Sequence, residues 1–401
     1  MATDSTSASR DPARPSSSTS DLFAGLYARG AVAAAVDGPA WLQALLDVEV
    51  ALARACAAEG LIPADAADAI AAVCRTERFD LGRIAAEAAD AATPVIALVG
   101  ALRAALPPPV AEHVHHGATS QDIVDTAAML VALRALEPLC EDAHAAADAA
   151  AALADAHRDT VVPGRTLLQR ALQMSFGLKA AGWLDGIDAA LTGLAAVRQG
   201  GLAVQMGGPV GDRHPAIAAR VAAQLGLADP VMPWHTQRSR PAALAAALGI
   251  LAGALAKVAR DVTLLAQDEL GEVREGGPPG RGGSSTMPHK RNPVAAVSVL
   301  ACAQRVPGLV ATMLGAMVQE HERATGAWQA EWGTLSDLLR LTGSAAAWSR
   351  DLLEGLEVDP QRMRLNAERM TARDDLGAAG VLIDRALAAH RDQTDLEEDD
   401  P

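Results

Sequence analysis

The sequence predicts an all-α protein, and three observations favour this fold class. Hydrophobic residues make up 50% of the 401 residues and aromatic residues only 2%, because alanine supplies much of the apolar content. Alanine has the highest helix propensity, whereas the tyrosine, phenylalanine and threonine that favour strands are scarce. Long stretches with few helix-breaking residues exceed the usual helix length, which indicates a bundle of long helices.

Two segments precede the long helices. Residues 1–20 are rich in Ser, Thr, Asp and Pro and have no apolar core, so we expect a disordered N-terminus and no signal peptide. Residues 21–112 show helical spacing of apolar side chains, with breaks at residues 60–63 and at the three prolines of residues 107–109. These features predict an N-terminal helical domain over residues 21–112.

Residues 113–357 are expected to form the central helical-bundle domain. Its long helices are predicted over residues 120–156, 171–199 and 242–272. A loop rich in Gly and Pro, residues 200–233, separates the last two of these helices. Residues 358–390 are expected to add a short C-terminal helical domain, and residues 391–401 an acidic tail.

Charge and cysteine usage exclude several classes of function. A net charge of −15 argues against general nucleic-acid binding. The four cysteines show no paired spacing for a disulfide framework or a metal site, which favours a reducing cytoplasm. The apolar run 241–256 is short for a membrane span, so Gly249 and Gly253 within it are expected to mark close helix contact.

The most informative segment reads Gly-Ser-Ser-Thr-Met-Pro-His-Lys-Arg-Asn-Pro over residues 283–293. It places hydroxyl, ammonium and carboxamide groups on a short run that follows a stretch of Gly and Pro, residues 276–280. Glycine gives such a run the freedom to wrap a ligand, and mobile loops of this kind close over substrates. We therefore expect an active-site flap here, with a plain flexible linker as the alternative.

This segment resembles the shared motif of the fumarase/aspartase superfamily, Gly-Ser-Ser-x-Met-Pro-x-Lys-x-Asn-Pro, at every fixed position. Further blocks match in the order of the family, at residues 115–122, 164–179 and 320–323. The resemblance implies three all-α domains with a central bundle of five long helices. It also implies a homotetramer whose active sites take residues from three chains, with no metal and no organic cofactor. Members of the family are usually longer at the C-terminus than this chain.

The resemblance implies a role for each matching residue of the loop. Ser284 aligns with the catalytic base of the family, and Lys290 and Asn292 align with residues that contact the substrate. A serine hydroxyl acts as a base only where positive charge and backbone donors stabilise its alkoxide. The alternative is that Ser284 is an ordinary loop hydroxyl.

Substrate-binding residues are expected in the other blocks as well. His115 matches the substrate-contacting histidine of the family, although an isolated histidine is more often structural. Thr119 and Ser120 lie at a helix start, where they can cap the helix and point amide donors at a bound carboxylate. Arg238 and Arg323 match the carboxylate-binding arginines, a residue type that can hold a carboxylate with two hydrogen bonds.

Two missing residues indicate the branch of the superfamily. Fumarate-releasing lyases place a histidine after Gly-Arg-Thr and a glutamate soon after Lys-x-Asn-Pro, as a pair that protonates the leaving group. This chain has Leu167 and Val297 at those positions. The branch without the pair is that of the 3-carboxy-cis,cis-muconate cycloisomerases, whose reacting group is a carboxylate of the substrate. A carboxylate has a pKa of ~4 and needs no proton at neutral pH.

The resemblance thus implies closure of 3-carboxy-cis,cis-muconate to 4-carboxymuconolactone, a step in protocatechuate breakdown, by a small polycarboxylate-binding enzyme. Two alternatives stay open at this point. One is a fumarate-releasing lyase of the adenylosuccinate or argininosuccinate type, and the other is an inactive structural relative. The presence of Ser284, Lys290 and Asn292 argues against the inactive relative.

Overall fold

The computed structural model describes residues 22–287, 289–370 and 375–398, so the predicted disordered N-terminus lies outside the described residues. The helices are α1 (Ala24–Tyr27), α2 (Val32–Ala35), α3 (Gly38–Ala58), α4 (Ala64–Val73), η1 (Thr76–Arg78), α5 (Leu81–Ala91), α6 (Val95–Ala104), α7 (Pro108–Ala111), α8 (Ser120–Ala156), α9 (Phe176–Gly200), α10 (Pro215–Leu225), α11 (Ser239–Leu265), α12 (Val294–Gly315), α13 (Ala327–Glu354), α14 (Pro360–Ala367) and α15 (Ala379–Glu398). The strands are β1 (Val161–Thr166), β2 (Gln169–Ser175), β3 (Val273–Glu275) and β4 (Leu356–Val358).

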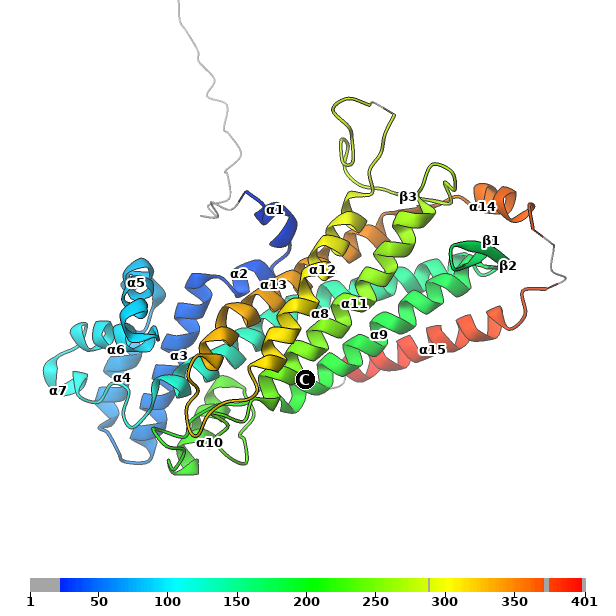
Figure 1. Cartoon of the computed structure of the whole chain (residues 1–401). Helices are drawn as coiled ribbons and strands as arrows, with labels where there is room; N and C mark the ends of the chain where they lie inside the picture. Colours follow the sequence, from blue (N-terminus) through cyan, green and yellow to red (C-terminus); the bar gives the residue numbers. More distant parts are fainter. Residues whose placement is uncertain (1–21, 288, 371–374, 399–401) are drawn as a thin grey trace, which may run out of the picture.

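Five long helices, α8, α9, α11, α12 and α13, form a bundle, which confirms the predicted fold class (Figure 1). Helix α8 packs against α9 and α13, and α11 packs against α9, α12 and α13. Many of the fully buried residues along α8 are alanines: Ala143, Ala146, Ala147, Ala150 and Ala154. Small side chains at such contacts allow the helix axes to approach closely.

Helix α8 has the predicted bounds, but the start of α9 differs from the prediction. Residues 169–175 form strand β2, which pairs with β1 in an antiparallel hairpin, so α9 begins at Phe176. The Ser175 side chain caps α9 by accepting a hydrogen bond from Leu178 N at 3.2 Å. The predicted third helix, α11, ends at Leu265 instead of residue 272.

Helices α11 and α12 are long and apolar enough to span a membrane by length and composition, a test that the core helices of soluble proteins also pass. They lie against each other within the bundle. A Cβ added to Gly249 would lie 2.9 Å from a methyl carbon of Val310, so the predicted close helix contact is confirmed there. Nothing lies within 4 Å of the same position on Gly253.

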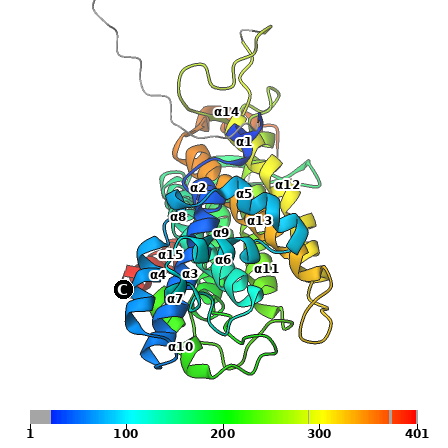
Figure 2. The same ribbon diagram turned by 90° about the vertical axis from the view of Figure 1, so that its left-hand side faces the viewer.

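Shorter helices cover the two ends of the bundle. Helices α4 to α7 gather beside α3 at one end, as Figures 1 and 2 show. Helix α15 runs back along the bundle and packs against α9 and α8 (Figure 1). It continues to Glu398, and the acidic tail over residues 391–401 stays a prediction.

Candidate active site

Ser284 lies on the long loop between β3 and α12, which projects from one end of the bundle (Figure 1). Its Oγ accepts hydrogen bonds from the backbone N–H groups of Thr286, at 3.3 Å, and Met287, at 3.2 Å. Donors aimed at an oxygen stabilise the negative charge that develops when it loses its proton. The loop backbone therefore supplies part of what a serine base requires.

The base of this loop is closed by Asn292. Its backbone N–H and its side-chain Nδ2 both donate to the Gly282 carbonyl, at 2.8 and 3.0 Å. Beside them, the Arg281 guanidinium pairs with Asp351 at 2.8 Å. The structure thus gives Asn292 a loop-closing role in addition to its predicted contact with substrate, while Lys290 lies exposed on the same loop.

Gly282→Ala should lower turnover by about 10-fold with little change in melting temperature, because misplacing a catalytic group by a small distance is costly. Gly282 has φ +72°, and a Cβ there would lie 2.3 Å from the Asn292 carbonyl oxygen. Steady-state kinetics and thermal unfolding would measure both effects. Gly333→Ala, in open space on α13, is the control and should leave turnover unchanged. Full activity of Gly282→Ala would show that the closed loop base is not needed.

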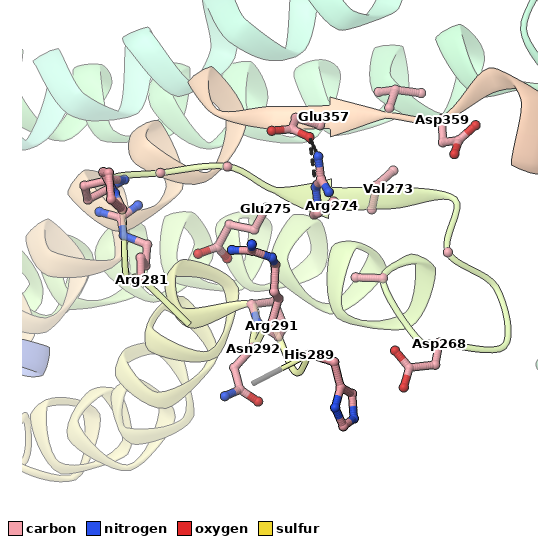
Figure 3. A pocket seen from close by; sticks show the side chains of 18 of the residues that line it. Asp268, Val273, Arg274, Glu275, Arg281, His289, Arg291, Asn292, Glu357 and Asp359 are labelled. Atoms are coloured by element: carbon pink, nitrogen blue, oxygen red, sulfur yellow. Dashed lines mark hydrogen bonds and ion pairs between the residues drawn. The ribbon is translucent and has the colours of Figure 1, made fainter. Parts of the chain in front are cut away.

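A pocket of about 830 Å³ lies at the foot of the loop (Figure 3). Its walls carry charges of both signs, and Figure 3 shows Arg274 of β3 paired with Glu357 of the neighbouring strand β4. The Glu275 carboxylate in the pocket accepts hydrogen bonds from Ala295 N, at 2.8 Å, and Ala296 N, at 3.2 Å. The cations of the pocket already have carboxylate partners or lie on the loop itself.

The other predicted residues gather at the opposite end of the bundle. The His115 Nδ1 lies 2.6 Å from the buried Glu49 Oε1, and the His115 backbone adopts φ +63°. A carboxylate that binds one ring nitrogen of a histidine fixes the orientation of the ring and leaves the other nitrogen for a ligand. The signal for Glu49 in the sequence, a single acidic residue inside the apolar run 48–53, was missed.

Thr119 and Ser120 begin helix α8 as predicted. Thr119 and Asp122 form a reciprocal capping box, in which the Asp122 carboxylate accepts from Thr119 N at 3.0 Å. Contact of Thr119 and Ser120 with substrate stays a prediction.

Arg323 lies beside this helix start. Its Nη2 donates to the carbonyl oxygens of Gly208, at 2.8 Å, and Pro209, at 2.9 Å, and its Nη1 donates to Glu322 O. Burial lowers the pKa of Arg323, and the charges of Asp122 and Asp125 act in the opposite direction. Through its contact with Gly208, Arg323 lies at the same end of the bundle as His115 and Thr119.

Arg238, the other predicted carboxylate-binding arginine, is only 3% exposed. Its guanidinium pairs with Asp125 at 2.7 and 3.0 Å and with Glu331, and Nη1 also contacts His235 O. All five N–H donors of an arginine are thereby occupied. Arg238 joins α11 to α8 and α13 inside the bundle, and its contact with substrate stays a prediction.

A single chain keeps the two groups of predicted residues apart. The loop with Ser284, Lys290 and Asn292 precedes α12, and Arg323 follows it. Helix α12 has 22 residues, and at 1.5 Å per residue its length is about 33 Å. The base and the carboxylate-binding residues of one chain therefore cannot meet on one small substrate.

The two positions that distinguish the branch are apolar and exposed. Leu167 and Leu168 form the two-residue turn between β1 and β2 with φ of +49° and +63°. Such turns favour Asn-Gly, because both residues need positive φ. Leu167 is 96% exposed, and Val297 in the first turn of α12 is half-exposed. Neither position offers a proton donor.

Among the described residues, no group of three or more His, Cys, Asp and Glu side chains is arranged to hold a metal ion.

Comparisons with known proteins agree with the motif analysis. Residues 30–308 match the model of a family described as lyase. A 3-carboxy-cis,cis-muconate cycloisomerase of Bradyrhizobium diazoefficiens is 46% identical over 362 residues, which cover 88% of this chain and 80% of that protein. A nitrosuccinate lyase of Streptomyces davaonensis is 44% identical over 365 residues, which cover 87% of this chain and 77% of that protein.

A solved structure has the same fold. The crystal structure of 3-carboxy-cis,cis-muconate lactonizing enzyme from Pseudomonas putida superposes with a TM-score of 0.87 at 36% sequence identity. The match covers 93% of this chain and 99% of that chain.

Proposed function

The chain belongs to the lyase family, a part of the fumarase/aspartase superfamily, and we propose that it converts 3-carboxy-cis,cis-muconate to 4-carboxymuconolactone. The observation that carries the proposal is that Leu167 and Val297 are apolar in a chain whose serine motif is complete. A reaction whose attacking or leaving group is a carboxylate needs no acid at those positions. The cycloisomerase relatives and the solved structure support the same activity.

The reaction is an internal addition. One carboxylate of the substrate forms a C–O bond to the conjugated double bond, and the displaced electron pair moves onto the neighbouring carboxyl group as an aci-carboxylate. Arg323 and Lys290 stabilise this charge where it develops. Ser284 then transfers its proton to carbon, and the alkoxide, stabilised by the Thr286 and Met287 amides, regains a proton from solvent. The product is an isomer of the substrate.

The separation of the two residue groups supports an active site shared between subunits. We propose that the assembly is a homotetramer in the cytoplasm. Residues at opposite ends of α12 can meet only if different subunits supply them. Ile250 on α11 and Leu314 on α12 are large, exposed apolar side chains on bundle helices, and association would cover them. In this arrangement Ser284 and Lys290 act on substrate held by His115, Thr119, Ser120 and Arg323 of other copies.

A direct assay tests the reaction. Purified protein added to 3-carboxy-cis,cis-muconate should remove the ultraviolet absorbance of the diene, because lactone closure destroys the conjugation. The protein should release no fumarate from adenylosuccinate or argininosuccinate, whose leaving nitrogen needs a proton. Fumarate release at a rate comparable with carboxymuconate turnover would instead establish the lyase alternative.

A second candidate is favoured by the relative named nitrosuccinate lyase. Elimination of nitrite from nitrosuccinate would leave fumarate, and nitrite, the anion of a weak acid, also departs without a proton. Leu167 and Val297 suit this reaction as well. Fumarate formed from nitrosuccinate, with no loss of diene absorbance from carboxymuconate, would replace the first proposal by this one.

A further inference from the structure

Asp122 is a fully buried carboxylate to which the proposed reaction assigns no role. It accepts hydrogen bonds from Thr119 N at 3.0 Å, Gly207 N at 2.9 Å and Gly208 N at 2.8 Å. Its Oδ1 also lies 2.8 Å from His235 Nε2. Each carboxylate oxygen thus serves two partners, and the partners come from three separate segments of the chain.

Two of those segments lead directly to the carboxylate-binding residues. The Gly208 N–H donates a hydrogen bond to Asp122, and the Gly208 carbonyl accepts one from Arg323 Nη2. One glycine thus links the buried carboxylate to the guanidinium of Arg323. Thr119 lies two residues after Gly117, and a Cβ on Gly208 would lie 3.2 Å from the Gly117 carbonyl oxygen. The loop that carries His115 and the loop around Gly208 are therefore in close contact.

The third segment, which contains His235, contacts the chain just before Arg323. Next to His235, the Thr236 hydroxyl donates to the His321 carbonyl at 2.9 Å. The His235 carbonyl accepts a hydrogen bond from Gln121 Nε2 of α8 at 2.7 Å. The segment of His235 therefore also contacts the start of α8. Asp122 is the atom group on which all of these segments converge.

We propose that Asp122 is a positioning residue that holds the loop of His115, the start of α8 and Arg323 in the geometry that binds the substrate carboxylates. The inference rests on the proposed function, since it concerns the carboxylate-binding half of that site. A residue that only capped α8 would need Thr119 as a partner. The additional donors from Gly207, Gly208 and His235 make Asp122 the connection between the segments.

Asp122→Asn separates these roles because it keeps the shape of the side chain. The N-cap of α8 is Thr119, whose side chain accepts a hydrogen bond from the backbone of residue 122, so this half of the capping box survives. One of the two oxygens becomes an NH2 group, which has no acceptor to offer the donors that oxygen served. The variant should therefore lose part of the hydrogen bonds that join Asp122 to Gly207, Gly208 and His235, while α8 stays folded.

The experiment compares substrate affinities between variants that all carry Ser284→Ala, so that the bound substrate is not converted. Calorimetry with 3-carboxy-cis,cis-muconate should give a Kd at least ~10-fold weaker for Ser284→Ala/Asp122→Asn than for Ser284→Ala, because a misplaced arginine loses its paired contacts. Asp37→Asn in the same background is the matched control. Asp37 caps α3 by accepting from Ala40 N at 2.9 Å and lies outside the network, so Kd should not change.

A second measurement does not depend on the substrate. Hydrogen exchange followed by mass spectrometry should be faster at residues 207–208 and 320–323 in Asp122→Asn and unchanged in Asp37→Asn. Unchanged Kd and exchange in folded Asp122→Asn would overturn the proposal. Failure of Ser284→Ala to bind substrate, with exchange altered as expected, would reject the proposed substrate and keep the role of Asp122. If Asp122→Asn does not fold, His235→Phe, which retains the cap, should show the same changes at smaller size.

Discussion

Ser284→Ala should reduce turnover by at least ~100-fold, the low end for a positioned acid or base, while the fold and the substrate affinity stay nearly intact. The hydroxyl is the proton carrier of the proposed reaction, and two backbone amides already point at its oxygen. Only one loop oxygen is removed, so the bundle is untouched. Loss of diene absorbance measures turnover, and calorimetry measures affinity.

Ser285→Ala is the matched control for this prediction. Ser285 is the exposed neighbour of Ser284 on the same loop and carries the same functional group. Its loss should change turnover far less than the loss of Ser284. A Ser284→Ala enzyme that retains most of its rate would remove Ser284 from the mechanism, and an inactive Ser285→Ala enzyme would transfer the role to its neighbour.

Two inactive variants, Ser284→Ala and Arg323→Ala, should restore activity when their subunits are mixed by co-expression. In a mixed tetramer each site that draws its serine and its arginine from different chains has about a one-in-four chance of receiving both intact residues. Recovered activity should therefore approach about a quarter of the wild-type value. Each variant alone should stay near background, because every one of its sites lacks the same group.

The pairing of Ser284→Ala with Lys290→Ala is the control, because both residues lie on the same loop of one chain. If one subunit supplies the whole loop, every site in this mixture receives one intact and one mutated residue of the pair. No site is then complete, and recovery should be absent. A molar mass of 41.2 kDa by light scattering, that of one chain, together with no recovery in either mixture, would contradict the shared site.

The long helices could be predicted from the sequence because propensity and helix capping act locally. Residues 120–156 were bounded correctly, since Thr119 and Asp122 form the predicted cap. The hairpin at residues 161–175 was missed because its stability comes from pairing between the two strands. Leucines in a turn that needs positive φ give no local turn signal.

The candidate site was predictable where a motif fixes chemistry and was not where partners are distant in the sequence. The Ser284 loop was found from its motif, and its amide donors come from the same short segment. The ion pairs of Arg238 could not be predicted, because its carboxylate partners, Asp125 and Glu331, are far from it along the chain. The same distance hid the contact of Asp122 with His235.

The carboxylate of Glu275 at the first turn of α12 affects how an anionic substrate can be held. The N-terminus of a helix carries a partial positive charge from the aligned peptide dipoles, and a bound anion can use it. Glu275 already neutralises that end of α12, and Asp122 does the same for α8. Most of the electrostatic attraction for the substrate carboxylates must then come from the formal charges of arginine and lysine side chains. Because exposed charges are screened by salt, the Michaelis constant of this enzyme should rise with ionic strength.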